Sequence, residues 1–147
     1  MIPDFITYPS CPWPLLPPGV HDASLEEIYD RFVTNERRGD LFTGLEKGTN
    51  NLFAGGCIEI FLDGSYVTAK PNPGDYDVAW NVQGVNPRDI DPIFLVFDNL
   101  REAQKKKYLG EYLPIIFSPI AATSETFRLF QRDKLTGNPK GIIRIKK

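Results

Sequence analysis

Two apolar segments joined by a short polar loop constrain the fold more than any other feature of this sequence. The stretch "CIEIFLDGS" is a β-branched apolar run ending in Asp-Gly, which predicts a buried strand followed by a tight turn. The stretch "DYDVAWNV" predicts a second strand. Its alternation sends Asp75 and Asp77 to one face and the aromatic side chains to the other. The aromatic face therefore belongs to the core, and the carboxylates face away from it.

Helical patterns precede these strands. Ser24 followed by Glu27 forms a capping box that begins a short helix. Asn35 can cap a second helix that runs to about Phe53. Three glycines inside this second helix each weaken it by ~1 kcal/mol: Gly39, Gly44 and Gly48.

The later part of the chain continues with mixed elements. A helix capped by Asn99 ends in three lysines, which suit a solvated helix C-terminus better than a nucleic-acid patch. The third strand, "EYLPIIFS", contains Pro114, which favours an edge position or a bulge. Ser124 begins a further helix, and a turn and a last strand end the chain. This order predicts an α+β fold.

The first residues differ in character from the rest. Six of the thirteen prolines fall within the first eighteen residues, so residues 1–20 are expected to form an extended arm on the surface of one domain, residues 21–147. Phe5, Trp13 and Leu15 are candidates for anchoring this arm. The alternative is that the arm is a partner-binding segment, as proline-rich ligands are.

Composition excludes several classes of protein. A chain of 147 residues with a net charge of −2 fits one globular domain without a strong attraction to nucleic acid. Its apolar runs are far shorter than the roughly 20 residues that cross a bilayer. No Lys or Arg precedes Arg31, which argues against a secretory signal and favours the cytoplasm. The two cysteines are expected to be reduced thiols.

The loop between the two central strands has the residues of a phosphate and metal site. Gly64 and Ser65 follow a strand directly, so the backbone can turn sharply and offer N–H groups and a hydroxyl to a phosphate. Asp75 and Asp77 share a face and can bind one Mg²⁺ or a close pair of ions. The alternative for each motif alone is a plain surface connection. Together they favour a metal–nucleotide site.

These residues carry a resemblance to a known superfamily. "IEIFLDGS", nine intervening residues and "DYDV" resemble the nucleotidyltransferase superfamily of DNA polymerase β, especially its small minimal nucleotidyltransferases. "LPPGVHDASLEEIYDRFV", "FLDGSYVTAK", "GDYDVAW" and "NPKGIIRI" look like a compact, largely uncharacterised bacterial family built on that core. The resemblance extends over most of the chain from Leu16 onward.

The resemblance implies a mixed sheet with flanking helices and the transfer of a nucleoside monophosphate from an NTP, with ATP expected, to a hydroxyl. Gly64 and Ser65 would contact the triphosphate, and Asp75 and Asp77 would ligate Mg²⁺. A third carboxylate would help deprotonate the acceptor. Its positional match is Glu111, for which a salt-bridging surface role is the alternative.

The sequence also departs from the pattern of the superfamily. "TAK" replaces the Arg-Gly that often follows Gly-Ser in minimal enzymes, so Lys70 either supplies the charge for a phosphate or is a solvated loop lysine. The helical domain of larger relatives is missing, which implies a shallow site that a partner or an oligomer completes.

Two functions from different classes follow. The first is a Mg²⁺-dependent nucleotidyltransferase that modifies a protein or RNA, as antitoxins of this superfamily do to a partner toxin. The second is a catalytically degenerate protein of the same fold that binds a nucleotide or a partner protein. The aspartates favour the enzyme, and the uncertain third acid favours the binding protein.

Overall fold

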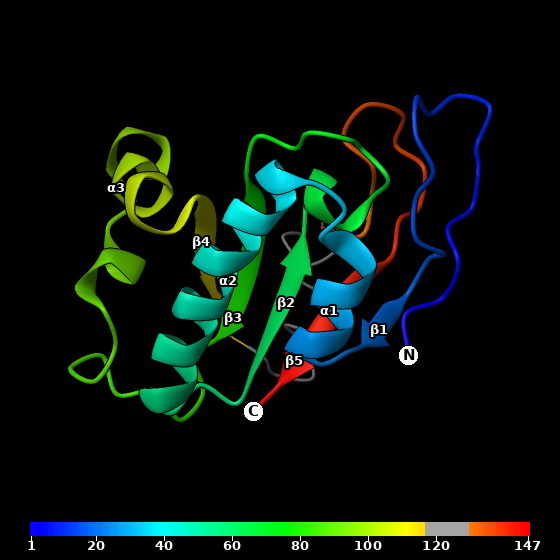
Figure 1. Cartoon of the computed structure of the whole chain (residues 1–147). Helices are drawn as coiled ribbons and strands as arrows, with labels where there is room; N and C mark the ends of the chain where they lie inside the picture. Colours follow the sequence, from blue (N-terminus) through cyan, green and yellow to red (C-terminus); the bar gives the residue numbers. More distant parts are fainter. Residues whose placement is uncertain (117–129) are drawn as a thin grey trace.

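A mixed β-sheet forms the frame of the molecule (Figure 1). Within residues 1–116 and 130–147, which the computed structural model describes, five strands lie in the order β1-β5-β2-β3-β4. The strands are β1 (Val20–Asp22), β2 (Glu59–Asp63), β3 (Tyr76–Asn81), β4 (Gly110–Ile115) and β5 (Ile142–Lys146). β2 is antiparallel to β3 and β5, whereas β1 runs parallel to β5 and β4 runs parallel to β3. The predicted α+β class is confirmed.

Helices α1 (Leu25–Phe32) and α2 (Glu36–Ala54) cover one face of this sheet (Figure 1). Val78 and Trp80 of β3 lie in the main core beneath them, together with Ile60 and Leu62 of β2. The opposite face carries a second, smaller apolar cluster that includes Phe61. The predicted alternation of β3 is therefore confirmed, with its aromatic side chains in the core.

Both predicted helix starts are confirmed by their capping bonds. The Ser24 hydroxyl accepts a hydrogen bond from the Glu27 backbone N–H at 3.1 Å, and the Glu27 carboxylate accepts the Ser24 N–H at 2.8 Å. Asn35 Oδ1 accepts the Arg38 N–H at 2.9 Å at the start of α2. Each cap satisfies backbone donors that the first turn of a helix leaves unpaired.

Two of the helix glycines are needed because another segment comes very close. A Cβ on Gly44 would lie 2.0 Å from the carbonyl oxygen of Tyr108, and one on Gly48 would lie 2.1 Å from the Tyr112 hydroxyl. Gly39 has only an ordinary contact at 3.6 Å. The first two glycines therefore trade helix propensity for close packing of α2 against α3 (Asp98–Tyr108) and β4.

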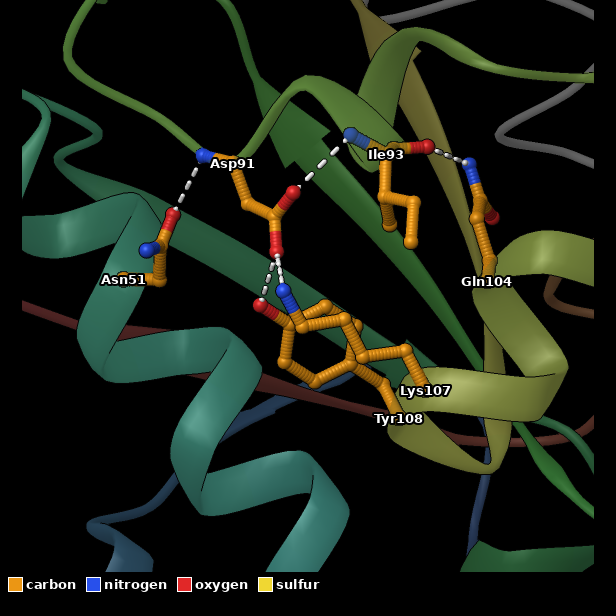
Figure 2. A network of polar contacts seen from close by, with 6 residues as sticks. All are labelled: Asn51, Asp91, Ile93, Gln104, Lys107 and Tyr108. Carbon is orange, nitrogen blue, oxygen red and sulfur yellow. Dashed lines mark hydrogen bonds and ion pairs between the residues drawn. The ribbon is translucent and has the colours of Figure 1, made fainter.

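Asp91 is the centre of a polar network that ties α3 to α2 (Figure 2). Its backbone N–H donates to Asn51 of α2 at 2.7 Å, and its carboxylate accepts hydrogen bonds from Lys107 and the Tyr108 hydroxyl of α3. Gln104 of α3 donates at 3.2 Å to the backbone of η2 (Pro92–Leu95). The network fixes the position of α3 beside β4.

The structure differs from the sequence prediction at several places. Strand β1 was not expected, because its three residues pair only with the distant strand β5. Asn99 does not cap a helix. It lies at φ 52°, and the next two residues are also left-handed, so the regular part of α3 begins after Arg101. Pro114 lies in the edge strand, as predicted. The helix predicted from Ser124 falls outside the described residues.

The N-terminal arm contains no regular element before β1, which begins at Val20, apart from one bridge between Ile6 and Leu15. Leu15 is fully buried, and the ring of Phe5 packs edge-on against Phe32 at 6.1 Å between centroids. Both residues anchor the arm, as predicted. In the part of the chain that the structure describes, no helix is both long enough and apolar enough to span a bilayer.

The glycine contacts in α2 lead to a paired prediction. Gly44→Ala is expected to lower the free energy of unfolding by about 1–3 kcal/mol, because the added methyl group collides with the Tyr108 backbone. Gly39→Ala on the same helix is expected to raise it by up to about 1 kcal/mol through helix propensity alone. Urea denaturation of the two variants provides the measurement. Equal effects would contradict the packing role of Gly44.

Candidate functional site

Three carboxylates lie side by side on the sheet face that is turned away from α1 and α2. The register places Asp63 of β2 opposite Asp77 of β3, and Asp77 opposite Glu111 of β4. Like charges in directly opposed positions repel each other. The site therefore depends on how this negative charge is compensated.

A hydrogen bond between Asp77 and Glu111, which requires one proton between the two carboxyl groups, relieves their repulsion. Burial, together with the hydrogen bond to Glu111, raises the pKa of Asp77 to about 7. Burial acts against ionisation of Glu111 as well, but its hydrogen bond with Asp77 and its ion pair with Lys105, at 3.1 Å, hold the pKa of Glu111 below its usual range. In this pair, protonated Asp77 donates to the Glu111 carboxylate.

Asp75 is a further carboxylate close to the pair of Asp77 and Glu111. It immediately precedes β3 and is half-buried. Burial and the nearby charge of Glu111 raise its pKa, although the surrounding cations, including Lys105 and Lys134, act in the opposite direction. The two aspartates of the Asp-x-Asp motif thus both lie where a positive charge would stabilise their ionised forms.

Asp63 is compensated by a buried lysine. The Lys140 ammonium lies 2.7 Å from Asp63 Oδ1, and each side chain is only 5% exposed. The two residues make up an ion pair in the interior of the protein, beside Asp77.

Two adjoining cavities contain the six candidate residues. Gly64, Ser65, Lys70, Asp75 and Asp77 line one cavity of about 270 Å³. Glu111 lines a neighbouring cavity of about 220 Å³, to which Asp77 also contributes. Together the two volumes fall within the roughly 300–1,000 Å³ that small-molecule sites occupy. The exposed Lys134 borders both cavities and adds positive charge.

Gly64 is required where it stands for two reasons. Its φ of +88° belongs to the left-handed half of the backbone map, and a Cβ at this position would lie 2.6 Å from Asp77 Oδ2. Only a glycine lets the turn come this close to the carboxylate. Ser65 begins the short 3₁₀ turn η1 (Ser65–Val67), directly beside the same cavity.

The start of α2 holds the loop between the Gly-Ser turn and Asp75. The buried guanidinium of Arg38 donates to the carbonyl oxygens of Tyr66, Thr68 and Lys70 at 2.6–2.7 Å. Arg37 donates to the carbonyl oxygen of Pro73 at 3.2 Å and also to that of Gly74. These bonds fix the distance between the two halves of the motif.

Mg²⁺ binding by this site depends on the oxygen donors that its side chains offer. Across residues 1–116 and 130–147, no group of three or more His, Cys, Asp or Glu side chains is arranged to hold a metal ion. Asp75 and Asp77 nevertheless offer the carboxylate oxygens that Mg²⁺ prefers. Asp77 also lies close to the Glu111 carboxylate, so negative charge is in excess there. A cation can balance this charge as well as a proton can. The pair therefore fits this ion chemically.

One comparison with known proteins identifies the family of the chain. Residues 11–146 match the model of DUF6932, described as a family of unknown function. The chain belongs to DUF6932. No curated protein and no solved structure matches it. For this DUF6932 protein, the chemistry must therefore be inferred from its own residues.

For this DUF6932 protein, sequence reasoning missed the ion pair between Asp63 and Lys140 and the place of Trp13 beside the cavity. Asp63 shares the alternation that places Phe61 on the second face of the sheet, so the period of β2 could have revealed it. Lys140 gives no such signal, because its partner is 77 positions earlier in the chain. Trp13 was expected only as an anchor, but it also lines the larger cavity.

The shared proton predicts how stability depends on pH. Because the pKa of Asp77 is raised in the folded state, its contribution to stability is present below the usual carboxyl pKa and is lost as the pH rises through about 7. Asn in its place is a neutral mimic of the protonated acid. Asp77→Asn is therefore expected to gain about 2–4 kcal/mol relative to wild type on going from pH 5 to pH 8.

Urea denaturation at both pH values measures this difference. The exposed aspartate of α1 gives a matched control, Asp30→Asn, which should show no comparable change. A difference between wild type and Asp77→Asn that is the same at pH 5 and pH 8 would contradict the shared proton.

The buried ion pair leads to a second prediction for this site. Lys140→Met leaves the carboxylate of Asp63 buried without a partner, so a loss of about 3–5 kcal/mol is expected. Adding Asp63→Asn should recover part of the loss. The exposed pair of Asp22 and Arg144 is the control, and Asp22→Asn should cost under about 1 kcal/mol. Thermal and urea denaturation decide between these outcomes. If Lys140→Met lowers the free energy of unfolding as little as Asp22→Asn does, the ion pair of Asp63 and Lys140 does not behave as a buried pair.

Proposed function

We propose that this protein is a Mg²⁺-dependent nucleotidyltransferase that transfers a nucleoside monophosphate from an NTP, with ATP as the expected donor, to a hydroxyl of a protein or RNA. The observation that carries the proposal is the cavity shared by the Gly64–Ser65 turn and the two aspartates, Asp75 and Asp77. The antiparallel pairing of β2 with β3 joins these two motifs. It also supports a nucleotidyltransferase-like version of the mixed sheet.

Each group has a role in this chemistry. The Gly64–Ser65 turn would hold the triphosphate, and Lys70 and Lys134, which border the same cavity, would balance its charge. Asp75 and Asp77 would hold Mg²⁺, whose charge supports the phosphoryl displacement when the ion is bound. The acceptor oxygen would form a bond to the α-phosphorus while the bond from that phosphorus to the bridging oxygen breaks. Pyrophosphate would leave with that oxygen.

The proton of the acceptor hydroxyl requires a base. Glu111 is the candidate, because its pKa is held low and it is therefore an ionised carboxylate next to Asp77. A base must have a free lone pair within reach of the hydroxyl that it deprotonates. Glu111 borders the smaller cavity, so an acceptor entering there would meet it.

One observation favours the second function, a degenerate protein that binds a nucleotide or a partner. Glu111 is held by Lys105 at 3.1 Å and by Arg101 at 3.9 Å, and its carboxylate accepts a hydrogen bond from Asp77. A carboxylate engaged in this way is a poor base. In this alternative, the cavity binds a nucleotide without transfer, and the protein acts on a partner, such as a toxin, by docking.

Nucleotide binding with and without Mg²⁺ tests the proposal. Calorimetry with ATP is expected to show Mg²⁺-dependent binding to wild type and at least about a tenfold loss in the double variant Asp75→Asn, Asp77→Asn, which removes both metal ligands. The double variant Asp30→Asn, Asp40→Asn removes the same charge from exposed positions of α1 and α2, and it should bind as wild type does. Mg²⁺-independent binding to all three proteins would contradict the metal site.

Transfer is measured separately with nucleotide labelled at the α-phosphate, using the partner proteins and RNA of a cell extract as acceptors. Label transfer that Glu111→Gln abolishes would support Glu111 as the base, and transfer that survives this change would remove Glu111 from the mechanism. Binding without any transfer would favour the degenerate protein.

A further inference from the structure

The proline-rich arm contributes an aromatic wall to the candidate site. Trp13 lines the cavity of about 270 Å³ together with Gly64, Ser65 and the two aspartates of the motif. Among the described residues that line this cavity, the one other large apolar side chain is Leu135, which is 71% exposed. One flat aromatic surface thus lies among groups that suit phosphate and metal.

Several contacts hold the segment of the arm that carries Trp13 in position. The residues next to Trp13 are fixed by the hydrogen bond from the Ala69 N–H to the Pro14 carbonyl oxygen at 3.1 Å and by the fully buried Leu15. The tip of the arm is held from the other side, where Asn138 donates to the Ser10 hydroxyl at 3.0 Å. Figure 1 shows the arm running beside the segment that leads into β5. A bound molecule would therefore meet Trp13 in a preformed place.

The indole of Trp13 contacts the ammonium of Lys70, which also lines the cavity. The Lys70 ammonium lies 5.1 Å from the centroid of the Trp13 ring, which is a cation–π contact. The same lysine borders the Gly64–Ser65 turn through the shared cavity. An anion at that turn would draw the ammonium toward itself and free a face of the indole. The aromatic surface and the phosphate charge are thus coupled through one flexible side chain.

We propose that Trp13 is a stacking platform for the base of the nucleotide, so that the ligand is recognised as a nucleoside triphosphate and not as a bare polyphosphate. This inference rests on the proposed function, because it takes the Gly64–Ser65 turn as the phosphate site. Every nucleobase has a π-face that can stack on an indole, whatever its hydrogen-bonding edge. The platform therefore selects for an aromatic base but does not distinguish one base from another. The arm is then part of the site.

The experiment compares ATP with inorganic tripolyphosphate, each as its Mg²⁺ complex, on the whole chain. Wild type is expected to bind ATP more tightly than tripolyphosphate. Trp13→Leu is expected to weaken ATP binding about 10- to 100-fold while changing tripolyphosphate binding little, because only the stacking contact is lost. Trp13→Phe should keep most of the ATP affinity. Tyr8→Leu changes another aromatic of the arm that does not line the cavity, and it should match wild type for both ligands.

A second measurement needs no variant. The chain has two tryptophans, and Trp80 is only 2% exposed, so quenching of the fluorescence by acrylamide reports mainly on Trp13. Bound Mg·ATP should protect Trp13 from the quencher, whereas bound Mg·tripolyphosphate should not.

The outcomes separate this inference from the function on which it rests. Tripolyphosphate binding with no added affinity for ATP, an equal loss of both ligands in Trp13→Leu, or ATP binding without protection of the indole would each overturn the platform and leave the phosphate site in place. A wild-type protein that binds neither ligand would overturn the proposed function, and the platform with it.

Discussion

The candidate site depends on the buried guanidinium of Arg38. Among the residues that the structure describes, its partners are carbonyl oxygens and not carboxylates. Arg38 is 2% exposed, and its charge is satisfied by the carbonyl oxygens of the loop that follows the Gly-Ser turn. A buried charge is costly unless hydrogen bonds satisfy it, so the loop can take few other shapes while Arg38 stays inside. The path from Gly64 to Asp75 is therefore determined by α2, which packs on the opposite face of the sheet.

The same principle governs the acidic face. Asp63, Asp77 and Glu111 occupy one row across β2, β3 and β4, and three free charges in that row would oppose the register that aligns them. The structure compensates each in a different way. Lys140 pairs with Asp63, a shared proton neutralises Asp77, and Lys105 pairs with Glu111. Of these three, the proton on Asp77 is the one that is lost near neutral pH, because the pKa of Asp77 is about 7. A cation would therefore be expected to replace the proton at Asp77.

Much of this architecture could be predicted from the sequence, and the helix cap predicted at Asn99 is a local exception. Local signals gave the caps at Ser24 and Asn35, the alternation of β3 and the edge position of Pro114, because each depends on neighbouring residues. The residues proposed for phosphate and metal do line adjoining cavities. What else escaped depends on contacts between distant residues. Strand β1 exists only through β5, and the roles of Lys140 and Trp13 are set by residues far away along the chain.

The glycines of α2 show why such contacts override local preference. By propensity alone, Gly44 and Gly48 are defects, yet each lies where a side chain would strike α3 or β4. The close fit at Gly44 and the Asp91 network hold α3 near α2, and α3 in turn carries Lys105 to Glu111. Distant segments also meet at the larger cavity. The N-terminal arm places Trp13 there, and the segment before β5 places Lys134 and Lys140 there. Side chains from segments near both ends of the chain thus border the same cavity, although they are far apart in the sequence.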